Sequence, residues 1–192
     1  TAQLREENIQ DVPVAVSALS GTTLEDNSIK DVQELMWSVP SLVVGTNQSS
    51  GTGNFSIRGV GTGAQNFGLE SSVGLYIDGV YRARQASMFN QLVDLEAIEI
   101  LRGPQGTLFG KNSASGALLV SSVKPSHDQN AFLDFTAGNY SMANFSGGFN
   151  VSLSDTLAAR TTIFSGERDG YIEVDNLSGE LNDRSRWGIR QQ

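Results

Sequence analysis

The sequence contains no cysteine and a single histidine, His127, among its 192 residues. Disulfide bridges, iron–sulfur clusters and thiolate zinc sites are therefore excluded, and so is a metal site built from several histidines. Proline is scarce, at 4 residues, so the chain is neither collagen-like nor a proline-rich linker. The longest apolar run, Ala117 to Val120, has four residues, far below the about 18 of a transmembrane helix.

Basic residues are also few. The chain has 13 basic and 21 acidic residues and a net charge of −8. Residues 1–126 carry 8 basic and 12 acidic groups, and residues 127–192 carry 5 and 9, so each part has the same net charge of −4. With no basic region to neutralise phosphates, the composition argues against a nucleic-acid partner.

Glycine is abundant, at 21 residues, and the sequence changes character near Pro125. The first part mixes short strands with short helical patterns, which predicts an α+β domain with a small mixed sheet. An apolar stripe at Ile29, Val32, Leu35, Met36 and Val39 predicts a helix over 29–38, capped by Ser28. A short helix is predicted at 89–95. Strands are predicted at 12–19, 42–46, 54–58, 73–81, 97–101 and 117–123.

The second part alternates apolar and polar residues over long stretches. From 143 to 154 the odd positions are apolar or Gly and the even positions are Asn, Ser or Gly, which predicts a strand longer than most soluble ones. Similar patterns precede it at 131–137 and follow it at 157–163, and another strand begins near Trp187. The alternation alone fits either the wall of a transmembrane β-barrel or a soluble β-sandwich that buries its apolar face.

Two glycine motifs resemble nucleotide sites but lack the required parts. The run from Gly59 to Ala64 has the dinucleotide spacing, but 65–72 is too short and turn-rich for the helix that would bind the pyrophosphate. The run from Gly106 to Asn112 has the wrong glycine spacing for a P-loop and no Ser or Thr for Mg²⁺. No catalytic triad or metal cluster is evident, so we expect no enzyme activity, no metal and no cofactor.

Four blocks in this order, over essentially all of 1–125, together resemble the plug domain of TonB-dependent outer-membrane receptors. They are REENIQDVPVAVSALSGTTLED at 5–26, FSIRGVGT at 55–62, VGLYIDGVYRARQ at 73–85 and EAIEILRGPQGTLFGKNSASGALLVSSVKP at 96–125. The resemblance implies a plug domain at 1–125, inside a barrel of about 22 strands. Residues 126–192 then hold only the first antiparallel barrel strands, so the chain is expected to be a truncated part of a longer protein.

The same resemblance implies a function. We expect a receptor in the outer membrane, with its N-terminus in the periplasm, that binds a scarce chelate such as a siderophore and imports it. Its partners would be a TonB-type energy transducer, contacted at or upstream of Thr1, the rest of the barrel and the lipid bilayer. The alternative is a soluble periplasmic or extracellular binding module with a β-sandwich tail. The identity of the substrate does not follow from the sequence.

Two plug loops, 62–71 and 82–90, are the candidates for contact with substrate. They offer hydrogen-bonding, aromatic and positively charged side chains, namely Gln65, Asn66, Phe67, Tyr81, Arg82 and Arg84. Their positive charge suits an anionic ligand. In the barrel strands we expect the odd positions of 143–153 to face lipid, and even positions such as Asn150 to tolerate substitution in a polar lumen.

Two arginines each close a strand immediately before a glycine. The resemblance implies that Arg58 and Arg102 form ion pairs with glutamates of the barrel wall and so latch the plug; within this chain both are expected to lack carboxylate partners. Six glycines are expected to allow turns or close backbone approach, namely Gly59, Gly79, Gly103, Gly106, Gly110 and Gly116.

Overall fold

The computed structural model describes residues 14–46, 53–63, 69–84, 92–173 and 180–192. The chain divides into two compact units, Thr1–Val123 and Lys124–Gln192. Within the described ranges, no helix is both long and apolar enough to cross a membrane.

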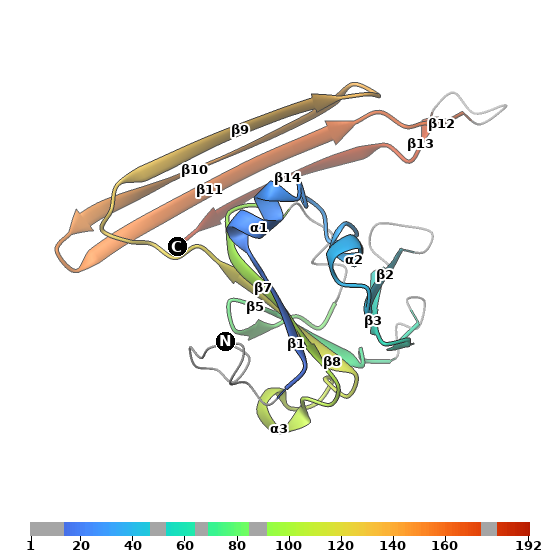
Figure 1. The fold of residues 1–192 in the computed structure, drawn as a ribbon. Helices are drawn as coiled ribbons and strands as arrows, with labels where there is room; N and C mark the ends of the chain where they lie inside the picture. Colours follow the sequence, from blue (N-terminus) through green and yellow to red (C-terminus); the bar gives the residue numbers. More distant parts are fainter. Residues whose placement is uncertain (1–13, 47–52, 64–68, 85–91, 174–179) are drawn as a thin grey trace. The chain divides into compact units, whose positions relative to one another are not determined.

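The first unit is built on a five-stranded mixed sheet (Figure 1). Its strands, in spatial order, are β1 (Val16–Ser20), β7 (Leu95–Arg102), β8 (Gly116–Ser122), β5 (Val73–Ile77) and β6 (Val80–Tyr81). The pair β5–β8 is parallel and the other pairs are antiparallel. The mixed sheet expected from the sequence is therefore present.

One face of this sheet carries the main core. Two short helices, α1 (Gly21–Asp26) and α2 (Leu35–Ser38), contribute to it, together with a second sheet of β2 (Leu42–Thr46), β3 (Gly53–Ile57) and β4 (Val60–Gly61). The buried cluster joins apolar side chains from these elements to those of the five-stranded sheet, among them Leu24, Val32, Leu35, Phe55, Ile57, Leu75, Ile100 and Leu118. A smaller cluster of Tyr76, Leu101, Ala117 and Leu119 forms separately.

The helix predicted over 29–38 is shorter than expected. Only Leu35–Ser38 is helical, and Ser28 is no cap, because its φ of 55° is left-handed. The Glu34 carboxylate instead accepts hydrogen bonds from the backbone N–H groups of Lys30 (2.6 Å) and Asp31 (3.0 Å). The apolar stripe is nevertheless real, since Ile29, Val32, Leu35 and Val39 are buried and Met36 packs against them.

Two other predictions in this unit need correction, and two short helices were not predicted. The single strand expected at 73–81 is a hairpin, because Asp78 and Gly79 both have positive φ (50° and 78°), as a two-residue type I′ turn requires. The helix expected at 89–95 falls partly outside the described residues, and Leu95 already begins β7. The sequence reading also missed α1 and the short helix α3 (Gly106–Phe109).

The second unit is a four-stranded antiparallel sheet. Its strands, in spatial order, are β14 (Arg184–Gln191), β11 (Leu157–Arg168), β10 (Met142–Ser154) and β9 (Asn130–Gly138). Two short strands, β12 (Ile172–Glu173) and β13 (Glu180–Leu181), pair with each other. The strands expected from alternation are all present, and the long strand predicted at 143–154 matches β10 to within one residue.

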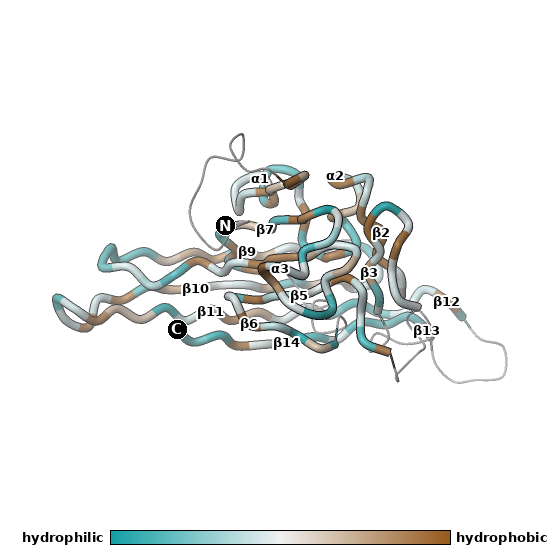
Figure 2. The backbone as a smooth tube through the Cα atoms, turned by 90° about the horizontal axis from the view of Figure 1, so that it is seen from below, coloured by the Kyte–Doolittle hydropathy of each residue, from teal (hydrophilic) through white to brown (hydrophobic). Residues whose placement is uncertain are grey.

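Teal and brown segments alternate along the strands of this sheet (Figure 2), as expected where polar and apolar side chains occupy opposite faces. The apolar face is open to solvent: Phe135 is 68% exposed and Trp187 78% exposed, and Phe149 and Ile163 are also exposed. Within the described residues this face packs against no second sheet, which the β-sandwich alternative requires. The opposite face carries Asn150 and, by strand register, Arg160, Arg168, Arg184, Arg186 and Arg190.

Asn150 was expected to tolerate substitution, but it is only 2% exposed. Its amide nitrogen donates to the backbone oxygens of Ser126 and Asp128, both at 2.6 Å. Its side-chain oxygen accepts the backbone N–H of Ser126 at 3.1 Å. Asn150 therefore fixes the segment that leads into β9, and a residue that alternation marks only as polar has a specific structural role.

Candidate functional site: the loop end of the five-stranded sheet

Three loops emerge at one end of the five-stranded sheet. Because β5 and β8 are parallel, the loops that lead into them, ending at Ser72 and Ser115, lie at the same end, and the Ser115 N–H donates to the Ser72 oxygen at 2.9 Å. The hairpin β5–β6 brings the chain back, so that the Arg82 N–H donates to the Leu75 oxygen at 2.8 Å. We call this region, residues 62–63, 69–72, 81–84 and 103–115, the loop end.

The loop end unites the two segments expected to contact substrate. Gln65, Asn66 and Phe67 lie outside the described residues. Tyr81 is partly buried, and Arg82 and Arg84 are exposed. The base of the first loop is closed by Thr62, whose hydroxyl accepts the Ser72 N–H at 2.9 Å and donates to the Glu70 backbone oxygen at 3.3 Å.

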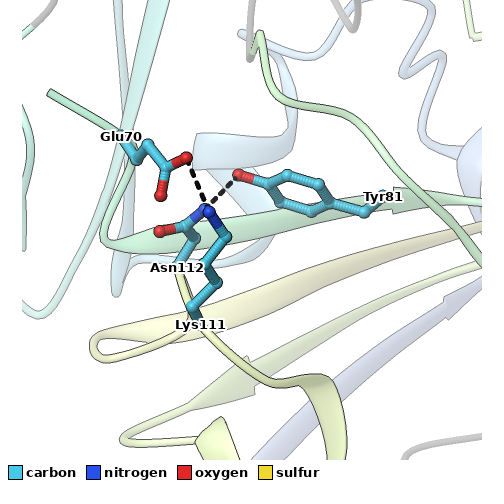
Figure 3. Close-up of polar contacts among 4 residues, drawn as sticks. All are labelled: Glu70, Tyr81, Lys111 and Asn112. Atoms are coloured by element: carbon cyan, nitrogen blue, oxygen red, sulfur yellow. Dashed lines mark hydrogen bonds and ion pairs between the residues drawn. The ribbon is translucent and has the colours of Figure 1, made fainter. Parts of the chain in front are cut away.

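A polar network ties the three loops together (Figure 3). The Lys111 ammonium group contacts the Glu70 carboxylate at 2.9 Å, and the Asn112 amide donates to the Tyr81 hydroxyl at 2.8 Å. The hydrogen bond from Lys111, followed by one from Asn112, lowers the pKa of Glu70. The same contact with Glu70 raises the pKa of Lys111. Both groups of the ion pair are therefore charged at neutral pH.

The sequence reading missed Glu70, Lys111 and Asn112 as candidates. Lys111 and Asn112 were considered only as parts of a P-loop, which the structure does not form: α3 has four residues and both side chains are bonded to other loops. Glu70 and Lys111 are 41 residues apart, so no local pattern pairs them. The described residues also include no cluster of three or more His, Asp or Glu that could hold a metal ion.

An aromatic cluster supports the network from beneath. Tyr76 is largely buried, and its hydroxyl donates to the Phe109 backbone oxygen at 2.6 Å. Its ring centroid lies 5.5 Å from that of Tyr81 and 5.1 Å from that of Phe109. Burial raises the pKa of Tyr76, so it remains a neutral hydrogen-bond donor. The cluster links α3 to the β5–β6 hairpin and so limits how far Tyr81 can move.

The two arginines expected to latch the plug do end strands before glycines. Arg58 follows β3, is exposed and has a φ of 54°, a left-handed value that non-glycine residues seldom adopt. Arg102 is half-buried and donates to the backbone oxygen of Val16 (3.2 Å) and the hydroxyl of Ser17 (3.0 Å). Its Nε is buried without a hydrogen-bond partner among the described residues.

Gly116 explains how these two strand ends come together. A Cβ on Gly116 would lie 2.3 Å from the Leu101 backbone oxygen and 2.7 Å from Cδ1 of Ile57, the residues just before the two arginines. Its φ of 149° also disfavours a side chain. The other glycines with positive φ are Gly59, Gly79, Gly103 and Gly110. Gly106 begins α3, and neither a positive φ nor a close contact requires glycine there.

Comparison with known proteins identifies the family to which this fold belongs. Residues 8–117 match the family model described as TonB-dependent Receptor Plug Domain. The chain belongs to this family. The fold expected from the sequence, a plug followed by the first antiparallel strands of a TonB-dependent receptor barrel, is therefore confirmed.

This chain resembles several outer-membrane receptors. It is 31% identical to the ferrichrome outer membrane transporter/phage receptor of Escherichia coli K12, over 94% of this chain and 23% of that protein. It is 29% identical to the pesticin receptor of Yersinia pestis, over 72% of this chain and 20% of that protein.

Among solved structures, the ferric yersiniabactin uptake receptor of Yersinia pestis superposes with a TM-score of 0.78 at 23% identity. The superposition covers 93% of this chain and 28% of that receptor, and at this identity it shows the fold alone. The chain thus spans between 20% and 28% of the length of these relatives.

Proposed function

We propose that the protein containing this chain is an outer-membrane importer whose plug, residues 1–125, gates a barrel that begins at 126–192. It binds an iron–siderophore complex or a similar chelate from outside the cell. A TonB-type transducer then supplies energy for import by pulling on a segment at or upstream of Thr1. The family match of 8–117 carries this proposal, and the named relatives include a ferrichrome transporter and a ferric yersiniabactin receptor.

The polarity of the second unit supports the membrane part of the proposal. A sheet with one exposed apolar face and one polar, arginine-bearing face suits a barrel wall, with lipid on one side and a hydrated lumen on the other. The same exposed face would be an aggregation hazard on a protein free in water.

The loop end supports the binding part. It gathers hydrogen-bond donors and positive charge from three loops, and the sheet and the buried Tyr76 hold those loops in place. Tyr81, Arg82 and Arg84 remain our candidates for contact with substrate, with Gln65, Asn66 and Phe67 in the adjoining loop. No step of this function needs covalent chemistry, so we assign no catalytic residue.

Arg58 and Arg102 would hold the plug in place through glutamates of the downstream barrel. Two observations support this role. Arg58 occupies a left-handed turn position that Asn or Gly would fill with less strain, and the Nε of Arg102 is buried without a partner among the described residues. A bidentate carboxylate would satisfy such a guanidinium.

The test is uptake of radioactive iron by cells that produce the full-length receptor under iron limitation. Uptake of one or more ferric chelates should saturate with concentration and should stop when the transducer is deleted or a protonophore is added. Uptake that continues unchanged without the transducer would contradict the proposal. A receptor with both Arg58 and Arg102 changed to Ala should in addition admit large antibiotics. Normal exclusion of antibiotics by this variant would refute the role of the two arginines in holding the plug, but not the import function.

A further inference from the structure

We propose that Lys111 is a ligand-binding cation of the loop end that Glu70 occupies in the free receptor, and that an anionic chelate displaces the Glu70 carboxylate. This inference rests on the proposed import function and specifies the class of substrate: a ferric chelate with exposed anionic oxygens, from carboxylate, catecholate or hydroxycarboxylate groups.

The first argument is the weakness of the existing pair. The side chains of Lys111 and Glu70 are 78% and 59% exposed. An ion pair in such contact with water contributes little net free energy, commonly under about 1 kcal/mol, because both groups are well hydrated when they separate. A ligand anion that is held by other contacts can therefore replace the carboxylate at small cost.

The second argument is that the backbone beneath Lys111 is fixed, although its ammonium group is exposed. The Gly110 N–H donates to the Gly106 oxygen at 3.0 Å, and the hydroxyl of the buried Ser113 donates to the Gly110 oxygen at 2.8 Å. The Gln105 N–H donates to the Ser113 oxygen at 2.9 Å. A cation presented from a fixed turn loses less conformational entropy on binding than one on a loose loop.

The third argument concerns the hydrogen-bond donors and the positive charge near Lys111. The Tyr81 hydroxyl oxygen accepts the Asn112 amide hydrogen, so its own O–H can be donated to a ligand (Figure 3). Arg82 follows Tyr81 and is exposed at the same loop end. Glu70 is the acidic side chain in direct contact with Lys111, so its displacement would leave donors and positive charge facing the ligand.

The proposal predicts that substitutions of the two members of the pair change the affinity for an anionic chelate in opposite directions. Glu70→Gln removes the competing carboxylate and should tighten binding of an anionic chelate, about three- to fivefold for an exposed pair. Lys111→Gln removes the cation and should weaken binding by about tenfold or less. The double variant should bind an anionic chelate less tightly than Glu70→Gln alone, because it lacks the cation that the ligand would contact.

The measurement is quenching of intrinsic fluorescence in purified full-length receptor, titrated with three probes: a ferric tris-catecholate, ferric citrate and a neutral ferric tris-hydroxamate. Lys124→Gln is the matched control, since it removes one exposed lysine that follows the opposite end of β8. The opposite shifts should appear with the anionic probes, and affinity for the neutral probe should change less than about twofold in either variant.

Two results would overturn the inference while leaving import intact. In one, both variants weaken the binding of all three probes equally, which would mean that the pair only holds the two loops together. In the other, the wild-type receptor takes up the neutral probe but binds neither anionic one. Failure of the import function would look different, because the wild-type receptor would then show no transducer-dependent uptake of any probe.

Discussion

Replacing Asn150 with aspartate should release the segment that leads from the first unit into β9. The change keeps the size and shape of the side chain but removes both amide hydrogens. The carboxylate that replaces them would face the backbone oxygens of Ser126 and Asp128, which the amide nitrogen now contacts at 2.6 Å. The hydrogen bond from the Ser126 N–H at 3.1 Å could persist.

The magnitude follows from two lost hydrogen bonds at a buried site. Each contributes about 0.5–1.5 kcal/mol net, and leaving buried groups unsatisfied adds about 1–3 kcal/mol, so the local cost should be about 2–6 kcal/mol. Ten-fold in an equilibrium constant corresponds to about 1.4 kcal/mol, so protection against local opening should fall by at least about 30-fold and at most about 20,000-fold.

The assay is hydrogen–deuterium exchange of the intact receptor, followed by mass spectrometry of peptides that cover 124–130. Asn144→Asp is the control, because it makes the same chemical change on the same face of β10 at a residue that is less buried than Asn150. Exchange in 124–130 should accelerate in Asn150→Asp and not in the control. Equal exchange in the two variants would refute the anchoring role.

Three further predictions follow from other sites. Arg58→Asn should raise the local stability of its hairpin by about 0.5–1 kcal/mol in hydrogen exchange, because Asn suits the left-handed turn, and yet should increase entry of large antibiotics; unchanged exclusion would argue against the latch. Phe149→Arg should destabilise the folded barrel by about 2–4 kcal/mol if the position is near mid-bilayer, measured by urea unfolding in lipid vesicles, and a neutral result would mean that Phe149 does not contact lipid near mid-bilayer. The pKa of Glu70 is lowered by Lys111, so the contact is complete above the usual pKa of a glutamate and is lost as pH falls through the lowered value; affinity for an anionic chelate that stays charged should therefore rise in acid, and Glu70→Gln should abolish that rise.

The elements that follow a hydrophobic period could be predicted from the sequence. Alternation located β9, β10 and β11 because every second residue of a strand shares a face. The stripe from Ile29 to Val39 identified a buried face correctly even though most of it is not helical. Burial depends on which residues turn inward, and a bend held by Glu34 turns the same residues inward as a helix would.

What could not be predicted depends on contacts between distant residues. Helix α1 begins at Gly21, where a Cβ would lie 2.1 Å from the Leu95 oxygen, so its packing against β7 requires glycine, although its N-cap Ser20, which accepts the Thr23 N–H, is a local signal. The pair of Glu70 and Lys111 arises only when the sheet brings two loops to one end. The hairpin at Asp78-Gly79 is different, because its turn signal is local and could have been recognised.

The measurement that tests the central claim most directly is the permeability of the full-length receptor without its plug. Removal of residues 1–123 should convert a saturable, transducer-dependent uptake into passive entry, so that cells become sensitive to large antibiotics while ferric chelate uptake no longer requires the transducer. Resistance of the barrel to trypsin and its heat-dependent gel migration would show that the remaining barrel has folded. A folded receptor without this segment that still excludes large antibiotics and still imports only with the transducer would contradict the account.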